Sequence, residues 1–186
     1  MRDILINIHS IIPISRVNGP GNRMVIFFQG CYNNCIECFN PNTHSFEIRN
    51  LYTPKDILKQ FIKQNIEGIT ISGGEPFCQP LGLKNLLKIA KENYNLSTLV
   101  YTGFNFEQLN KKKECQFCFK YIDILIDGQY DKSKLEPTLL ARGSYNQKLY
   151  FFTDRYKLED LYMPAKAEII IEKDGTIKKT GFSCVN

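Results

Sequence analysis

The sequence predicts an α/β protein with a mostly parallel sheet. Short β-branched and aromatic runs, such as residues 24–29 and 69–71, are typical of buried strands. Apolar residues at helical spacing lie between such runs, as in residues 53–62 and 83–90. The two patterns alternate along the chain. Such alternation favours right-handed crossovers, which place successive strands parallel in one sheet.

The first elements surround the first predicted central strand. Residues 3–17 contain two short apolar runs, which predict a strand or hairpin packed against the main sheet. The Asn-Gly-Pro-Gly sequence at 18–21 predicts a turn just before the strand at 24–29. The first helix is expected to follow Thr53, a favourable N-cap residue, with Pro54 at its first position.

The second half of the chain continues the alternation. Strands are predicted at residues 69–71, 96–101 and 121–126, and helices at 83–90 and 106–113. Residues 149–152 and 167–171 predict late strands. The Lys-Asp-Gly-Thr sequence at 173–176 is a hairpin signal, so the C-terminal piece is predicted to be a short antiparallel hairpin.

Length and composition predict one domain over residues 1–186. The hydrophobic content of 43% and charged content of 23% are typical of a globular protein with one core. The net charge of +5 is modest. Residues 111–113 form a lysine cluster without interleaved aromatic residues, which favours a solvated helix end over a nucleic-acid patch. No nucleic-acid partner is expected.

The apolar runs are short. None approaches the roughly twenty residues that cross a bilayer, and the N-terminus lacks the continuous apolar core of a secretory signal. We therefore expect a cytoplasmic protein without membrane association. In a reducing compartment, the seven cysteines indicate metal or redox work rather than disulfides.

Cys31, Cys35 and Cys38 fall within eight residues, directly after the strand predicted at 24–29. A loop of this length can turn three thiolates toward one point, which suits a cubane iron–sulfur cluster. A closed structural site uses protein ligands at every position, whereas a catalytic metal keeps one position open. Three thiolates on a four-iron cluster leave one iron free to bind another ligand.

The remaining cysteines offer an alternative. A zinc knuckle completed by Cys78, or by the CxxC pair Cys115 and Cys118, would also use the thiolates of the loop. Zinc would not explain the glycine-rich segment at 72–76. A redox or accessory metal role stays open for the CxxC pair, but packing thiols are the expectation for all four, Cys184 included.

Several further motifs accompany the cysteine loop in a fixed order. They lie at residues 17–30, 39–44, 72–76, 101–103, 124–128 and 142–147. Together with the cysteine loop, they resemble the radical S-adenosylmethionine superfamily, and within it the small activating proteins of anaerobic ribonucleotide reductase. The resemblance covers a core of about residues 17–155. It implies an incomplete (β/α) barrel that is open on one side. It does not extend to the tail from Tyr162 onward.

The resemblance implies that the three cysteines hold a [4Fe-4S] cluster whose open iron chelates the amino and carboxylate groups of S-adenosylmethionine. One electron then cleaves the sulfonium–carbon bond, which gives methionine and a 5′-deoxyadenosyl radical. By resemblance, Gly73, Gly74 and Glu75 hold the methionine amino group. The residues themselves permit this, because glycines allow close backbone approach and a carboxylate accepts charge-assisted hydrogen bonds from an ammonium. Without the cysteine loop, a Gly-Gly segment after a strand is usually a turn.

Other candidate residues lie near predicted strand ends. Thr102 and Asp127 could bind ribose hydroxyls there, or could cap the helices that follow. Ser144 and Asn146 could contact the cofactor, or could form a structured turn. Phe39 follows the third cysteine, where the resemblance implies a position near the adenine; ordinary core packing is the alternative.

The resemblance implies an enzyme that removes a hydrogen atom from a glycine of a partner protein. The expected partner is a glycyl-radical enzyme such as anaerobic ribonucleoside-triphosphate reductase, and the expected electron donor is a flavodoxin or ferredoxin. One alternative is a radical S-adenosylmethionine enzyme that acts on another protein, a peptide or a small molecule. A second alternative is a non-catalytic iron–sulfur or zinc binding module.

Overall fold

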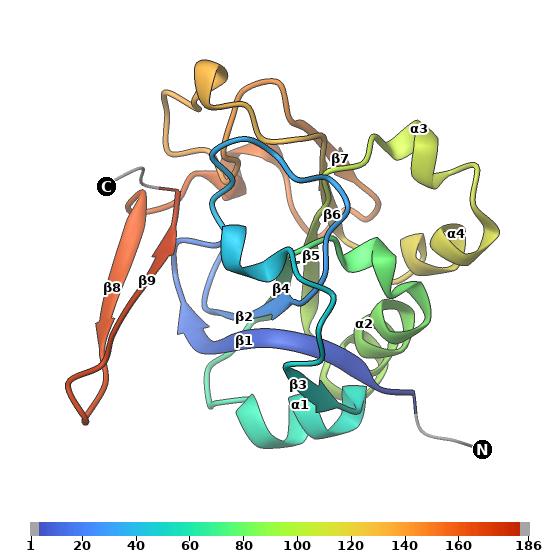
Figure 1. Cartoon of the computed structure of the whole chain (residues 1–186), viewed down its shortest axis with the longest axis vertical. Helices are drawn as coiled ribbons and strands as arrows, with labels where there is room; N and C mark the ends of the chain where they lie inside the picture. Colours follow the sequence, from blue (N-terminus) through green and yellow to red (C-terminus); the bar gives the residue numbers. More distant parts are fainter. Residues whose placement is uncertain (1–3, 183–186) are drawn as a thin grey trace.

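A seven-stranded mixed sheet forms the centre of the protein (Figure 1). The computed structural model describes residues 4–182. In sequence order the strands are β1 (Ile6–Ser15), β2 (Arg23–Phe28), β3 (Asn50–Tyr52), β4 (Gly68–Gly73), β5 (Ser97–Tyr101), β6 (Ile124–Asp127) and β7 (Lys148–Phe151). Their spatial order is β3-β1-β2-β4-β5-β6-β7.

Four neighbouring strands of this sheet, β2, β4, β5 and β6, are parallel. The outer strands β1, β3 and β7 pair antiparallel with their neighbours. The parallel strands are almost entirely buried, which explains why they read as continuous apolar runs without alternation. Parallel pairing also places their carboxyl ends at the same edge of the sheet.

Helices pack on one side of the sheet. They are α1 (Pro54–Phe61), α2 (Pro80–Tyr94), α3 (Phe106–Leu109) and α4 (Lys113–Phe119), and short 3₁₀ turns span Pro41–Thr43, Pro76–Cys78, Lys132–Lys134 and Leu158–Leu161. Buried side chains of α1, α2 and α4 share one hydrophobic core with the strands. Figure 1 shows α2 beside α4. The helix at Thr53 begins as predicted, because its Oγ1 accepts a hydrogen bond from Asp56 N at 3.1 Å.

The opposite side of the sheet has a smaller core. Leu99, Ile124 and Ile126 of the strands pack there against Leu140 and Leu161. Leu140 comes from the irregular segment between β6 and β7, and Leu161 from the 3₁₀ turn Leu158–Leu161 between β7 and β8, so neither partner lies on an α-helix. This side of the sheet is therefore covered by loops that also reach its carboxyl edge.

A separate antiparallel hairpin follows, made of β8 (Ala167–Ile171) and β9 (Ile177–Gly181). It is the C-terminal hairpin that the sequence predicts, and it extends along one side of the molecule, at the left of Figure 1. Over the described residues, β3 and β7 are the edge strands of the main sheet, so the sheet is not closed. The incomplete (β/α) barrel stays a prediction.

One element differs from the sequence-based expectation. The single helix predicted over 106–113 is two short helices, because the backbone of Lys112 is extended between them. Residues 6–15 form one strand, which is one of the two predicted alternatives, although Pro13 has no N–H to donate. The register shifts between Ile12 and Ser15, and such an irregularity accommodates a proline.

Within the described part of the chain, no helix combines the length and the apolarity that a bilayer crossing requires.

Candidate functional site

A cavity of about 620 Å³ opens at the carboxyl edge of the parallel strands. Its walls come from the segments that follow β2, β4, β5 and β6, which is where open α/β folds place their ligands. The volume is in the range of small-molecule and cofactor sites. The predicted residues that line it are Cys31, Cys35, Cys38, Phe39, Gly73, Gly74, Glu75 and Thr102.

The cysteine loop is fixed at its base by two backbone hydrogen bonds, from Gly30 N to Thr43 O at 2.8 Å and from Cys31 N to His44 O at 3.1 Å. Within the loop, Asn34 and Glu37 adopt left-handed backbone conformations with φ of 44° and 56°. Such residues reverse the chain direction locally. The reversals between the cysteines bring all three thiols to the cavity wall.

The thiols are half-buried and receive main-chain hydrogen bonds. Asn33 N lies 3.4 Å from Cys31 Sγ, and Asn40 N lies 3.3 Å from Cys38 Sγ. Burial raises the pKa of Cys31 and of Cys38, and these N–H groups act in the opposite direction. The same donors would stabilise thiolates bound to iron. The loop thus presents deprotonatable sulfur ligands with N–H donors already in place.

The donor set that the loop offers consists of three thiols. A four-iron cluster is held by cysteine thiolates at separate corners of its core. The three half-buried sulfurs around one cavity, with their N–H donors, fit a [4Fe-4S] cluster.

The other described cysteines lie outside the cavity lining. Cys115 and Cys118 are buried on α4 in the hydrophobic core, and burial raises the pKa of Cys118 to about 12. Their surroundings are those of packing thiols, which is the expectation of the sequence analysis. Cys78 is half-buried near Cys31; burial, with the nearby Glu75 and Cys31, raises its pKa to about 11. Cys184 lies outside the described residues.

Two glycines allow the segment after β4 to lie directly against the start of the cysteine loop. Gly73 has a φ of 97°, and a Cβ there would lie 2.6 Å from Phe28 N. A Cβ on Gly74 would lie 2.3 Å from the carbonyl oxygen of Gly30. The contact is closed by a hydrogen bond from Gly74 N to Phe28 O at 2.8 Å. Any larger residue would separate the two segments.

Glu75 ties the walls of the cavity together. Its side chain is 1% exposed. The carboxylate accepts hydrogen bonds from Gly103 N at 2.8 Å, Thr102 Oγ1 at 2.9 Å, Phe77 N at 3.0 Å and Asn33 Nδ2 at 3.3 Å. Burial raises the pKa of Glu75 to about 7, although these donors act to lower it. The residue thus joins the cysteine loop to the ends of β4 and β5.

Phe39 is part of an aromatic cluster at the cavity wall. Its ring centroid lies 4.3 Å from that of Tyr130 and 5.9 Å from that of Phe182. Tyr101, another lining residue, lies 5.8 Å from Phe182. Phe39 therefore lines the cavity and packs against aromatic neighbours at the same time.

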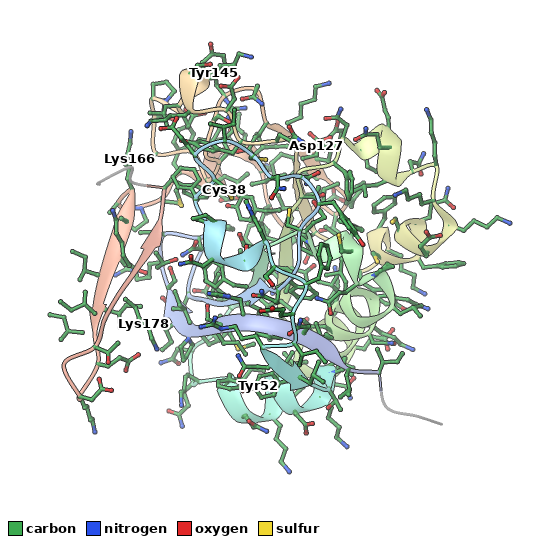
Figure 2. The ribbon with its side chains drawn as sticks, in the orientation of Figure 1. Cys38, Tyr52, Asp127, Tyr145, Lys166 and Lys178 are labelled. Carbon is green, nitrogen blue, oxygen red and sulfur yellow. The ribbon has the colours of Figure 1, made fainter. Side chains whose placement is uncertain are left out.

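Three predicted residues lie outside the cavity lining. Asp127, well separated from Cys38 in Figure 2, accepts a hydrogen bond from Phe106 N at 2.6 Å and so holds the start of α3. Ser144 is buried and accepts one from Asp131 N at 3.1 Å. Asn146 donates to Gln129 O at 2.9 Å. Their contacts are those of the capping and turn alternatives, and cofactor roles for them stay predictions.

Some lining residues were not predicted. Asn33 is one of them, and its position between the first two cysteines could have predicted that it lines the site. Residues 179–182 of the C-terminal hairpin also line the cavity. No motif in the tail marks them.

The comparisons with known proteins agree with this geometry. A sequence family described as "4Fe-4S single cluster domain" matches residues 17–150. The chain is 34% identical over 154 residues to the anaerobic ribonucleoside-triphosphate reductase-activating protein of Enterobacteria phage T4, with 80% of this chain and 96% of the phage protein covered.

Bacterial proteins with the same name give similar values. The Haemophilus influenzae protein is 32% identical over 151 residues, covering 75% of this chain and 94% of that protein. The Escherichia coli K12 protein is 30% identical over 155 residues, covering 77% and 97%. These relatives align over nearly their whole length and leave a fifth to a quarter of this chain unmatched.

Proposed function

We propose that this chain activates an anaerobic ribonucleoside-triphosphate reductase, because it belongs to the family of activating proteins of that reductase. The finer proposal is that it does so by radical S-adenosylmethionine chemistry. One observation carries it: three thiols, without a fourth from the described lining, share a cavity with the Gly-Gly-Glu segment. A site with an open metal position and a polar wall beside it suits a chelating cofactor.

Cys31, Cys35 and Cys38 would hold the [4Fe-4S] cluster. When reduced by a flavodoxin or ferredoxin, the bound cluster would supply one electron that cleaves S-adenosylmethionine into methionine and a 5′-deoxyadenosyl radical. Activation of the partner would then be the transfer of a hydrogen atom from one of its glycines to that radical, which would give 5′-deoxyadenosine and a glycyl radical. The protein's part is to bind and orient both reactants.

The polar wall after β4 supports an ammonium-binding role. Gly73 and Gly74 lie in the cavity lining, and the next residue, Glu75, adds a buried carboxylate. A charged ammonium bound there would gain charge-assisted hydrogen bonds, which are stronger in the low local dielectric of a buried site than in water. It would also favour the charged form of Glu75. Thr102 and Phe39 lie in the same lining and are proposed to contact the ribose and the adenine.

A second hollow of about 840 Å³ adjoins the cavity and shares Cys35 with it. Its lining is rich in carboxamide side chains: Asn33, Asn34, Asn105, Gln108, Gln129 and Asn146. A carboxamide offers both a donor and an acceptor, which is what the main chain of an extended peptide requires. A glycine has no side chain to recognise, so this lining supports a peptide loop as the second reactant.

Anaerobic reconstitution tests the proposal. The expected result is iron near four per chain, release of 5′-deoxyadenosine under reduction, and a glycyl radical signal by electron paramagnetic resonance when the reductase is added. Release of 5′-deoxyadenosine without the glycyl signal would indicate another substrate. Bound metal without any cleavage would indicate a non-catalytic module and reject the proposal.

A further inference from the structure

The C-terminal hairpin β8–β9 lies outside the part of the chain that the family domain matches, which ends at residue 150. Even so, Lys179, Thr180, Gly181 and Phe182 line the same cavity as the three cluster cysteines. The family domain therefore does not supply all of the cavity wall in this protein. The added segment supplies part of it.

Polar contacts fix the base of the hairpin against the turn that precedes β2. Asn18 Nδ2 donates to Thr180 Oγ1 at 2.8 Å, and both side chains are buried. Glu168 accepts hydrogen bonds from Ser15 Oγ at 2.7 Å and from Arg16 N at 3.0 Å. Buried polar groups that are fully paired specify one arrangement, so the hairpin has a defined position on the domain.

The last described residues continue this wall. Phe182 N donates to Lys166 O at 2.6 Å. Gly181, with a φ of 104°, brings the chain so close that a Cβ there would lie 2.4 Å from Lys166 O. This close approach directs Phe182 to the cavity rather than along the strand.

Phe182 joins two walls of the cavity. Its ring meets that of Phe39 at an interplanar angle of 86°, with centroids 5.9 Å apart, and that of Tyr101 with centroids 5.8 Å apart. Phe39 follows the ligand Cys38, whereas Tyr101 ends β5. The contact with Phe39 is edge-to-face, an arrangement that stabilises ring positions beyond the area it buries, and the contact with Tyr101 is tilted. Phe182 thus connects the cluster loop to the sheet.

We propose that the hairpin β8–β9 is a wall of the cofactor cavity that this chain adds to the family domain, with Phe182 as a positioning residue for the adenosyl part of S-adenosylmethionine. Phe182 holds Phe39 in place and extends the apolar surface on which a flat adenine ring packs. This inference rests on the function proposed above. It goes further by assigning cofactor binding to residues beyond the matched domain.

The absence of tryptophan from the whole chain provides a direct test. Phe182→Trp introduces a single tryptophan at the cavity. Ile171→Trp, at a position that is 71% exposed on the same hairpin and outside the cavity lining, is the matched control. In reconstituted holoprotein titrated with S-adenosylmethionine, we expect a saturable change in fluorescence for Phe182→Trp and none for Ile171→Trp.

Equilibrium binding gives the second measurement. Phe182→Ala should weaken the affinity for S-adenosylmethionine about tenfold. It should raise KM for 5′-deoxyadenosine release, while kcat and the iron content stay at wild-type values. Phe182→Tyr should restore the affinity. If Phe182→Ala fails to fold, Phe182→Leu serves in its place.

The outcomes separate this inference from the proposed function. The role of the hairpin would be overturned if the wild type binds S-adenosylmethionine, the fluorescence of Phe182→Trp does not change on titration, and Phe182→Ala keeps the full affinity. The proposed function would then still stand. An equal response from Ile171→Trp would also overturn that role. A reconstituted wild-type protein that binds no S-adenosylmethionine would overturn the function and this inference with it.

Discussion

The hydroxyl of Thr102 lies 2.9 Å from Glu75 Oε1 and 3.0 Å from Oε2, so the ends of β4 and β5 are joined through one carboxylate. Because Glu75 is buried, Glu75→Ala leaves several donors without an acceptor. We expect the free energy of unfolding of the protein without cluster to fall by about 2–4 kcal/mol. Glu75→Gln keeps one acceptor oxygen and should cost less.

Urea unfolding measures this effect. Glu92→Ala is the matched control, because Glu92 is exposed and pairs with Lys88 only at 3.8 Å. That change should cost less than about 0.5 kcal/mol. Equal costs for Glu75→Ala and Glu92→Ala would show that the Glu75 network does not stabilise the site.

The position of Cys78 leads to a second prediction. Cys78 is half-buried near Cys31 but outside the cavity lining, so Cys78→Ser should keep iron near four per chain and should keep cleavage of S-adenosylmethionine. Cys35→Ser should lose both the iron and the cleavage, because Cys35 lines the cavity and is one of the three proposed cluster ligands. The measurements are iron analysis, cluster absorbance and 5′-deoxyadenosine release.

A buried cysteine provides the control for these thiol substitutions. Cys118→Ser places a hydroxyl in the hydrophobic core, so it should lower stability but leave the iron content unchanged. Loss of the cluster in Cys78→Ser would make Cys78 a fourth ligand. The proposed open iron position would then be wrong.

The sequence predicted the centre of the site for a physical reason. The cysteine loop and the Gly-Gly-Glu segment each follow a central strand, and parallel pairing of β2 with β4 brings the two together. The start of α1 at Thr53 was likewise predictable, because a cap is local. Local signals of this kind are read directly from neighbouring residues.

Other features depend on contacts that no local pattern marks. Asn18 and Thr180 are 162 positions apart, and their hydrogen bond places the hairpin at the cavity. The direction of the Asp127 side chain is set by Phe106 on a neighbouring segment. Strand-end position alone did not distinguish Asp127 from Thr102, which does line the cavity.

Arg23 supports a third prediction, on stability. Its side chain is fully buried, and all its N–H groups point to nearby oxygens: Nε donates to Thr70 Oγ1 at 2.7 Å, and the two terminal nitrogens bond to Pro20, Ile69 and Ser97. Burial lowers the pKa of Arg23. Arg23→Met would leave these acceptors unpaired and should cost about 3 kcal/mol or more.

Thermal or urea unfolding measures this cost. Arg155→Met is the control, since Arg155 is exposed and makes one hydrogen bond, to Asn95 O at 3.2 Å. It should change the free energy of unfolding by less than about 0.5 kcal/mol. Arg23→Lys retains some of the donors and should lie between the two. An Arg23→Met protein as stable as the wild type would contradict this account.

Asp123 gives a prediction for the pH dependence of stability. Its buried carboxylate accepts hydrogen bonds from Lys91 Nζ at 2.6 Å, Thr153 Oγ1 at 2.7 Å and Thr98 N at 2.8 Å. Burial alone would raise the pKa of Asp123, but these bonds outweigh it and hold the pKa below the ordinary 3.8. The ionised form is therefore more favourable in the folded than in the unfolded protein.

The sign of the effect follows from linkage. A carboxylate whose pKa is lower in the folded state stabilises the protein above its unfolded pKa, and this contribution is lost as pH falls through the folded value. Asp123→Asn breaks the buried pair with Lys91 and should cost about 3 kcal/mol at pH 7. The difference between wild type and Asp123→Asn should narrow as pH falls from about 5 toward 2, because the wild type loses the contribution that the variant lacks. Urea unfolding across this range measures it, with the exposed Asp154→Asn as control, and a constant difference would show that Asp123 does not carry the acid dependence.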